Sequence, residues 1–185
     1  NNPQADDAPQ LRTAVPPGDW QLEARLQLAQ FDPTNHFHVG LMVGTSDAQI
    51  LTWGLLLGPG LPGGPTSPEA WLEPTGNSGY VKVPGETLLA TFRLTKTGNI
   101  FRAELRRGDG DWEQAGTYAF PEEPVFAGLI GKTFSDGPPV IFDVDYVSLW
   151  PAAEREVTAP PAPAAPQPPP PAPPAETPAA ETPAP

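Results

Sequence analysis

Two aspartates near the end of the chain, Asp143 and Asp145, are candidates for catalytic chemistry. They stand two residues apart in an apolar segment, so a β-strand would present both carboxylates on one face. A retaining glycosidase needs two carboxyl groups about 5 Å apart, one as nucleophile and one as general acid. In the alternative interpretation, Asp143 ends a structural strand and accepts hydrogen bonds from backbone amides of a neighbouring turn.

Two further pairs of residues suggest metal ligands. His36 and His38 are the only histidines and would face one side of a strand, but a catalytic zinc site needs a third protein ligand, such as Asp32. We favour the simpler interpretation that they are polar residues entering a strand. Asp109 and Asp111 put two carboxylates in one turn, which could begin a structural calcium site. A complete calcium site needs six to eight oxygens, so ordinary turn chemistry is the competing interpretation, and we expect no other cofactor.

Aromatic side chains offer a third kind of site, because the apolar face of a sugar can stack on an indole or phenol ring. Five tryptophans are many for 185 residues. Trp71 and Tyr80 flank an irregular stretch, residues 72–79, and are the predicted ligand-binding platform. They could instead pack beneath their own loop. Trp53 alternates with Leu51 and Leu55 and is expected in the core.

Period-two alternation predicts the elements that must position these residues. Trp20, Leu22, Ala24, Leu26 and Leu28 share one parity, which indicates a strand with one solvated face. Residues 37–44 are apolar on both parities, as in a strand that is covered on both sides. Further strands are expected at 49–58, 88–97, 100–107, 112–120, 125–133 and 140–150. No window has helical spacing over three turns, so the sequence predicts an antiparallel all-β sandwich of nine or ten strands.

The composition divides the chain into three parts. Residues 1–18 are expected to form an extended N-terminal arm, residues 19–150 the sandwich, and residues 151–185 a Pro/Ala-rich tail. Such a tail favours the extended polyproline II conformation and cannot form a packed core. Its threonines Thr158, Thr177 and Thr182 are candidate O-glycosylation sites. We expect the tail to act as a spacer to a cell surface, a glycosylated solubilising tail, or a strap that docks on a neighbouring subunit.

Net charge and composition exclude several classes of partner. The formal charge is −12, with only ten basic residues, so nucleic acid and anionic membrane surfaces would be repelled. The chain has no cysteine, and no apolar stretch reaches the roughly 20 residues of a membrane-spanning helix. It begins at Asn1 without methionine or a basic and apolar leader, as expected for a secreted protein after signal-peptide removal. A trimmed chain would look the same.

Five segments, taken in order, resemble the concanavalin A-like jelly-roll domains that accompany bacterial β-xylosidases, and related small bacterial domains of unknown function. The matching segments are 37–43 (FHVGLMV), 92–101 (FRLTKTGNIF), 108–112 (GDGDW), 125–129 (VFAGL) and 142–147 (FDVDYV). The resemblance covers residues 18–150 and implies two curved antiparallel sheets, core positions for Trp20 and Trp112, and a carbohydrate context. The related laminarinase-type strand carries Glu-x-Asp-x-x-Glu, whereas this chain has Ser148 at the third position, which makes that catalytic set incomplete.

Together these observations predict a non-catalytic module, extracellular at a bacterial cell surface, that binds a glycan or a protein neighbour. One alternative is a structural subunit of an extracellular polymer or sheath, which would pack against copies of itself while its termini strap neighbouring subunits. The other alternative is an unusual glycoside hydrolase that depends on Asp143.

Overall fold

A computed structural model describes residues 8–46, 49–59, 64–74, 81–134 and 139–152 of the chain. They form eleven β-strands, and they contain no helix long and apolar enough to cross a membrane. The strands are β1 (Gln10–Ala14), β2 (Trp20–Gln30), β3 (Phe37–Ser46), β4 (Gln49–Leu57), β5 (Glu69–Pro74), β6 (Val81–Val83), β7 (Leu89–Thr97), β8 (Ile100–Arg107), β9 (Glu113–Ala119), β10 (Phe126–Thr133) and β11 (Ile141–Pro151).

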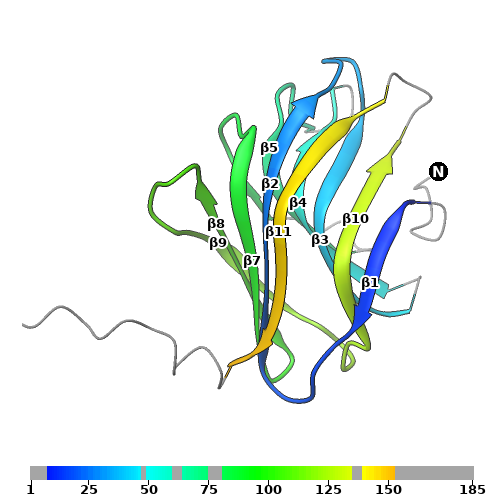
Figure 1. Cartoon of the computed structure of the whole chain (residues 1–185), viewed down its shortest axis with the longest axis vertical. Helices are drawn as coiled ribbons and strands as arrows, with labels where there is room; N and C mark the ends of the chain where they lie inside the picture. The colour runs from blue at the N-terminus through cyan, green and yellow to red at the C-terminus, as the bar shows by residue number, and fades with distance from the viewer. Residues whose placement is uncertain (1–7, 47–48, 60–63, 75–80, 135–138, 153–185) are drawn as a thin grey trace, which may run out of the picture.

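The strands form two sheets that stack face to face (Figure 1). The larger sheet has the order β1-β10-β3-β4-β5-β6, and the smaller sheet has the order β11-β2-β7-β8-β9. All paired strands run antiparallel. The structure therefore confirms the antiparallel two-sheet sandwich that the alternating sequence predicts.

The core lies between the sheets because alternate side chains of both sheets point inward. Trp53 on β4 is fully buried, as predicted, and it joins the two layers. Its ring meets that of Phe92 on β7 edge to face, with 5.4 Å between ring centroids, and its indole N–H donates to the carbonyl oxygen of Glu104 on β8 at 2.9 Å. Trp20 makes a similar edge contact with Phe101 at 5.5 Å. The Trp53 contacts join the two layers, whereas Trp20 and Phe101 pack together within the smaller sheet.

The outer face of the larger sheet is buried as well, as expected for a segment that is apolar on both parities. Among the residues that point away from the core there, the buried ones include His38, Met42, Ile50, Thr52, Leu56, Trp71 and Ile130. In the middle of this face Gly40 on β3 pairs with Gly54 on β4. A Cβ atom on Gly54 would lie 2.0 Å from the Val39 carbonyl oxygen and 2.5 Å from the Gly40 Cα, so neither strand has room for a side chain.

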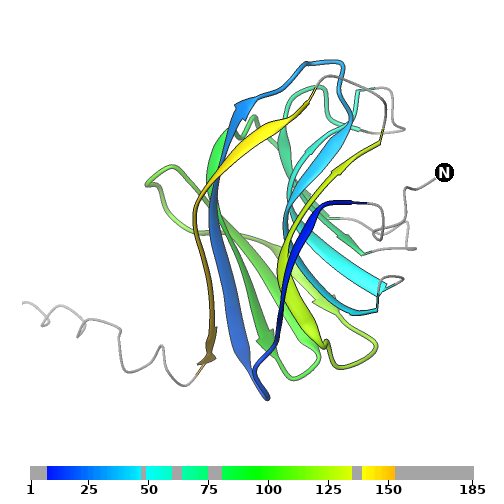
Figure 2. The same ribbon diagram turned by 45° about the vertical axis from the view of Figure 1, so that its right-hand side comes forward.

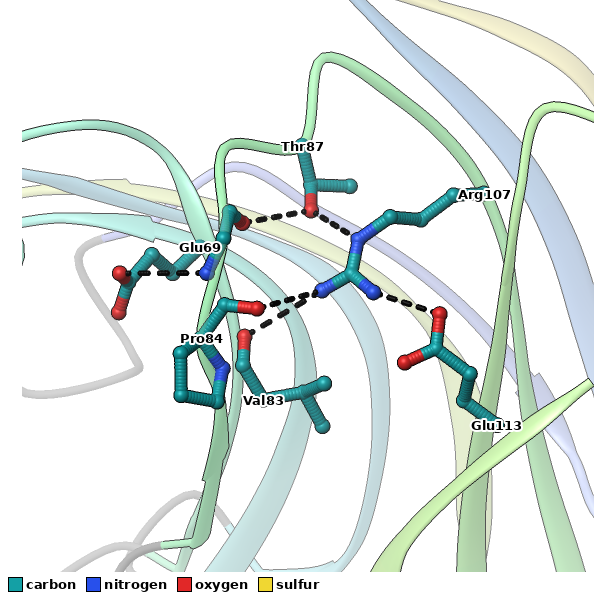
Figure 3. A network of polar contacts seen from close by, with 7 residues as sticks. Glu69, Val83, Pro84, Thr87, Arg107 and Glu113 are labelled. Carbon is teal, nitrogen blue, oxygen red and sulfur yellow. Dashed lines mark hydrogen bonds and ion pairs between the residues drawn. The ribbon is translucent and has the colours of Figure 1, made fainter.

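One long side of the sandwich is closed by Arg107, the last residue of β8 (Figure 3). Its Nε donates to Oγ1 of Thr87 at 2.9 Å, its Nη1 to Glu113 at 2.6 Å, and its Nη2 to the carbonyl oxygen of Pro84 at 3.0 Å. Pro84 follows β6, the edge strand of the larger sheet, whereas Arg107 and Glu113 belong to the smaller sheet. One guanidinium group therefore ties the two sheets together on this side.

The opposite long side is bordered by β1 and β10 of the larger sheet and β11 of the smaller sheet (Figure 2). Apolar side chains are exposed along its rim. Leu11 on β1 is 64% exposed and Val144 on β11 is 40% exposed. The two sides of the sandwich thus differ, with a polar tie on one and an apolar opening on the other.

Three short strands are absent from the sequence prediction. Strand β1 lies within the predicted arm, where residues 10–14 pair with β10, so the N-terminal boundary of the sandwich at residue 19 is wrong. Strand β5 extends through Leu72 into the stretch of residues 72–79 predicted to be irregular, and β6 lies just after that stretch. All three lie at or next to a sheet edge, where few apolar residues are needed to hold a strand in place. The sandwich also extends to Pro151, one residue beyond the predicted end.

Candidate functional site on the outer face of the larger sheet

Three ionisable side chains meet on the outer face of the larger sheet: His38 on β3, Glu73 on β5 and Lys132 on β10. Nδ1 of His38 lies 2.9 Å from Oε2 of Glu73, and Nζ of Lys132 lies 3.2 Å from the same oxygen. One carboxylate oxygen therefore lies within hydrogen-bonding distance of two nitrogen atoms. We refer to this arrangement as the His38–Glu73–Lys132 cluster.

The sheet register explains how residues far apart in sequence meet. Lys132 pairs directly with His38 between β10 and β3, whereas Glu73 lies two strands from His38. Gly40 and Gly54 lie between Glu73 and His38, and they carry no side chains above the sheet. Strands β3 and β4 are also bowed, with their outer face on the inside of the bend (Figure 2). The bend and the two glycines leave room for the side chains of Glu73 and His38 to meet.

Burial and charge set the protonation states of the cluster. Burial lowers the pKa of His38 and outweighs the nearby Glu73, which raises it, so the imidazole is neutral at neutral pH. Burial alone would raise the pKa of Glu73. The hydrogen bond from His38 and the charges of His38 and Lys132 overcome that effect and lower the pKa of Glu73 to about 2. At neutral pH the cluster is thus a neutral imidazole beside an ionised carboxylate.

The neutral imidazole donates Nδ1–H to the carboxylate, which leaves Nε2 as a buried acceptor. Nε2 has no hydrogen-bond partner of normal geometry among the described residues. Trp71 stands two residues before Glu73 and faces the same way, and Nζ of Lys82 lies 5.6 Å from the centroid of its ring. The face therefore combines hydrogen-bond acceptors, an ammonium group and an indole ring.

Acid is expected to destabilise the folded chain through this cluster. The pKa of Glu73 is about 2 against an ordinary 4.5, so its contribution is complete above pH 4.5 and is lost as the pH falls from 4.5 towards 2. His38 acts in the same direction from higher pH, because below pH 6.5 the unfolded chain accepts a proton that the buried imidazole resists. The Glu73 shift corresponds to a loss on the order of 3 kcal/mol.

Urea unfolding of the wild type and of Glu73→Gln between pH 7 and pH 3 measures this contribution. The free energy of unfolding of the wild type should fall more steeply than that of the variant below pH 4.5. Equal slopes would show that the carboxylate of Glu73 does not carry the pH dependence.

The predicted platform residues have different outcomes. Trp71 is on the candidate face, but it is only 4% exposed, so it is not the open platform that the sequence suggests. Tyr80 and the three threonines Thr158, Thr177 and Thr182 lie outside the described residues. Ligand binding by Trp71 and Tyr80 and O-glycosylation of the threonines remain predictions.

One acid of each predicted pair contacts the same cation of the protein, Arg25 on β2. Asp109 is 3.2 Å from Nη1 of Arg25, and Asp145 is 3.9 Å from Nε of the same arginine. Asp143 lines a small hollow beside Arg25, and Asp111 lies exposed in the turn before β9. Within the described part of the chain, no group of three or more His, Asp or Glu residues is placed to hold a metal ion. Structural calcium at Asp109 and Asp111 stays a prediction.

A β-bulge also changes the expected geometry of Asp143 and Asp145. The register between β11 and β2 shifts between Val144 and Tyr146, and Asp145 has no paired residue on β2. The alternation is interrupted at Asp145, but Asp143 and Asp145 still line the same hollow beside Arg25, on one face of the sheet as predicted. A bulge and two charges on an edge strand are features that discourage pairing with another chain.

The outer face of the smaller sheet carries a second polar network. The guanidinium carbon of Arg93 lies 3.4 Å from the centroid of the Trp112 ring, and Arg93 donates to Glu23 at 2.8 Å. The hydroxyl of Tyr146 also donates to Glu23, at 2.6 Å. The core position predicted for Trp112 is thus wrong, because this half-buried ring packs on the outside of the sheet.

No protein-family model and no curated protein matches the chain, but solved structures do. A functionally unknown protein from Saccharomyces cerevisiae is 16% identical with a TM-score of 0.61, over 77% of this chain and 72% of that one. A xylan β-1,4-xylosidase from Bacillus halodurans is 10% identical with a TM-score of 0.52, over 76% of this chain and 32% of that one. A β-1,3-glucanase from Mycobacterium marinum is 17% identical with a TM-score of 0.50, over 77% of this chain and 66% of that one.

These likenesses show a shared fold. The chain is a jelly-roll β-sandwich, and its structural neighbours include glycoside hydrolases. It spans about a third of the xylosidase chain, so the likeness concerns one part of that enzyme.

Proposed function

We propose that this chain is a non-catalytic β-sandwich module that binds a glycan on the outer face of its larger sheet. The observation that carries the proposal is the place of the His38–Glu73–Lys132 cluster. Three ionisable side chains from three strands meet there at one carboxylate oxygen, and perturbed pKa values are typical of functional sites. Glu73 is 26% exposed, so its carboxylate is accessible to a ligand from this side.

The groups on this face match the chemistry of a sugar. Glu73 accepts hydrogen bonds from hydroxyl groups, and the exposed ammonium of Lys82 donates to them. The indole of Trp71 is almost wholly buried beside the Gly40–Gly54 pair, so it supports this face from below and leaves the hydrogen bonding to Glu73 and Lys82. A site of this kind binds an uncharged or weakly charged glycan.

The positions of the carboxylates favour binding over hydrolysis. Glu69 and Glu73 share the outer face of β5 four residues apart, about 13 Å along the strand, and glycosidases hold their two carboxyl groups closer. With a pKa of about 2, Glu73 is ionised and cannot serve as a general acid at neutral pH. Asp143 and Asp145 belong to the other sheet.

Relatives in structure and sequence pattern support the carbohydrate context. The xylosidase and the glucanase act on glycans, and five sequence segments resemble the accessory domains of β-xylosidases. An extracellular location at a bacterial cell surface, with the Pro/Ala-rich tail of residues 153–185 as a spacer, is part of this proposal.

A glycan array probed with the full chain, followed by calorimetry on the best ligand, tests the proposal. We expect saturable binding that weakens at least tenfold in Glu73→Gln, which removes the charge that strengthens a hydrogen bond to the sugar, and in Lys82→Ala, which removes a hydrogen-bond donor. Lys82 is exposed, so its replacement should leave the fold intact. Trp112→Ala, on the opposite sheet, is the matched control and should change affinity less than twofold.

Loss of binding in Trp112→Ala with no effect of Glu73→Gln would move the site to the smaller sheet. No retention of any glycan would overturn the proposal. Light scattering of the full chain would then test the alternative of a self-assembling structural subunit, which requires an oligomer.

A further inference from the structure

A cavity opens between the two sheets on the side away from Arg107. Its volume is about 630 Å³, within the range of ligand pockets. Its walls come from β1, β3 and β10 of the larger sheet and from β11 of the smaller sheet. Apolar lining residues include Leu11, Phe37, Val39, Leu129, Phe142 and Val144.

The described part of the wall is mainly apolar, and its polar side chains are those of Gln10, Lys132 and Thr133. None of the described lining residues is acidic, and the one charged residue among them, Lys132, has its ammonium group bound to Glu73 on the outer face of the sheet. The exposed side chains of Leu11 and Val144 extend the apolar surface to the rim. Apolar surface of this kind gains free energy when an apolar ligand displaces water from it.

The chain's own adjoining segments are poor candidates to fill the cavity. Residues 1–7, which precede the lining residue Ala8, read Asn-Asn-Pro-Gln-Ala-Asp-Asp, and residues 135–138 read Ser-Asp-Gly-Pro. Neither segment has an aliphatic side chain larger than alanine or proline. Pairing of a strand from another protein with the free edge of β11 is also disfavoured, because this edge carries a β-bulge and the charges of Asp143 and Asp145.

We infer that this cavity is a binding site for an unbranched aliphatic chain, such as the acyl chain of a fatty acid or another single-chain lipid. The chain would enter between Leu11 and Val144 and lie against Phe37 and Leu129. The proposed sugar-binding face lies on the other side of the larger sheet, and the two sites have only Lys132 in common among the described residues that form them. Either one can exist without the other.

Displacement of 11-(dansylamino)undecanoic acid from the full chain by straight-chain alcohols of eight to twelve carbons tests the inference. We expect one binding site per chain and affinity that rises roughly fourfold with each added methylene. Dodecanoate is the second arm. Equal displacement by dodecanol and dodecanoate indicates that the chain alone is recognised, and stronger displacement by dodecanoate indicates a fatty acid.

Two variants on the same strand locate the site. Val144→Trp fills the mouth of the cavity and should weaken probe binding at least tenfold. Val147→Trp, at an equally exposed residue that does not line the cavity, should change it less than twofold. Thermal unfolding checks that both variants fold. Probe binding that never saturates, or equal effects of the two variants, would overturn the inference, as would competition by an apolar β-strand peptide without competition by alcohols.

Discussion

Gly54→Ala is expected to lower the free energy of unfolding by about 3 kcal/mol, which is at the upper end of the cost of overpacking. The new Cβ would lie 2.0 Å from the Val39 carbonyl oxygen and 2.5 Å from the Gly40 Cα. All of these neighbours are backbone atoms in a central strand pair, so relief requires β3 and β4 to separate. Urea unfolding followed by tryptophan fluorescence measures the loss.

Gly110→Ala is the matched control for this experiment. A Cβ there meets only the Arg107 carbonyl oxygen, at 3.2 Å, in an exposed turn, so the cost should stay below about 1 kcal/mol. If Gly54→Ala were as stable as Gly110→Ala, the close approach of β3 and β4 would be wrong. The Gly54 variant should also lose the acid sensitivity assigned to Glu73, because the same movement would part Glu73 from His38.

Trp53→Ala should cost about 4 kcal/mol, the range for removing a large aromatic side chain from a core. The indole is fully buried, packs on Phe92 and donates to the Glu104 carbonyl oxygen of the opposite sheet. Trp53→Phe retains most of the volume but loses the hydrogen bond, so we expect about half of that cost. Equilibrium unfolding in guanidinium chloride compares the variants.

Trp112→Ala provides the comparison in the same assay. Its ring is half-buried on the outside of the smaller sheet, stacked on Arg93, so its removal should cost about 1 kcal/mol. A cost of Trp53→Ala no larger than this would contradict the placement of Trp53 between the layers.

The sequence predicts the sandwich well where alternation is regular. From Trp20 to Leu28 the residues of one parity are apolar and those of the other are polar. This pattern fits a β-strand with one face against the core and the other face outward. Alternation fails where the register shifts. Regular alternation from the buried Phe120 would place Trp112 on the inner face. The register shift between β8 and β9 at Ala103 and Glu104 instead turns Trp112 to the outer face.

The candidate site is harder to predict from sequence. His38 and Glu73 are 35 residues apart, and Glu73 and Lys132 are 59 apart, so their meeting depends on strand order and register that local patterns do not contain. A signal exists at His38, because an ionisable residue in a strand that is apolar on both faces needs a partner. The partner can be identified only when the strand order is known, with β10 next to β3 and β5 next to β4.

Arg107 makes four hydrogen-bonding contacts, with Thr87, Val83, Pro84 and Glu113. These contacts hold the two sheets together along one edge of the sandwich. Thermal motion that separates the layers must then pivot about this edge, and its amplitude grows with distance from it. The largest displacements of the two sheets are then expected at β1 and β11, the strands farthest from this edge in their sheets. Breathing of the two layers would therefore widen the mouth of the apolar cavity while leaving the Arg107 edge unmoved.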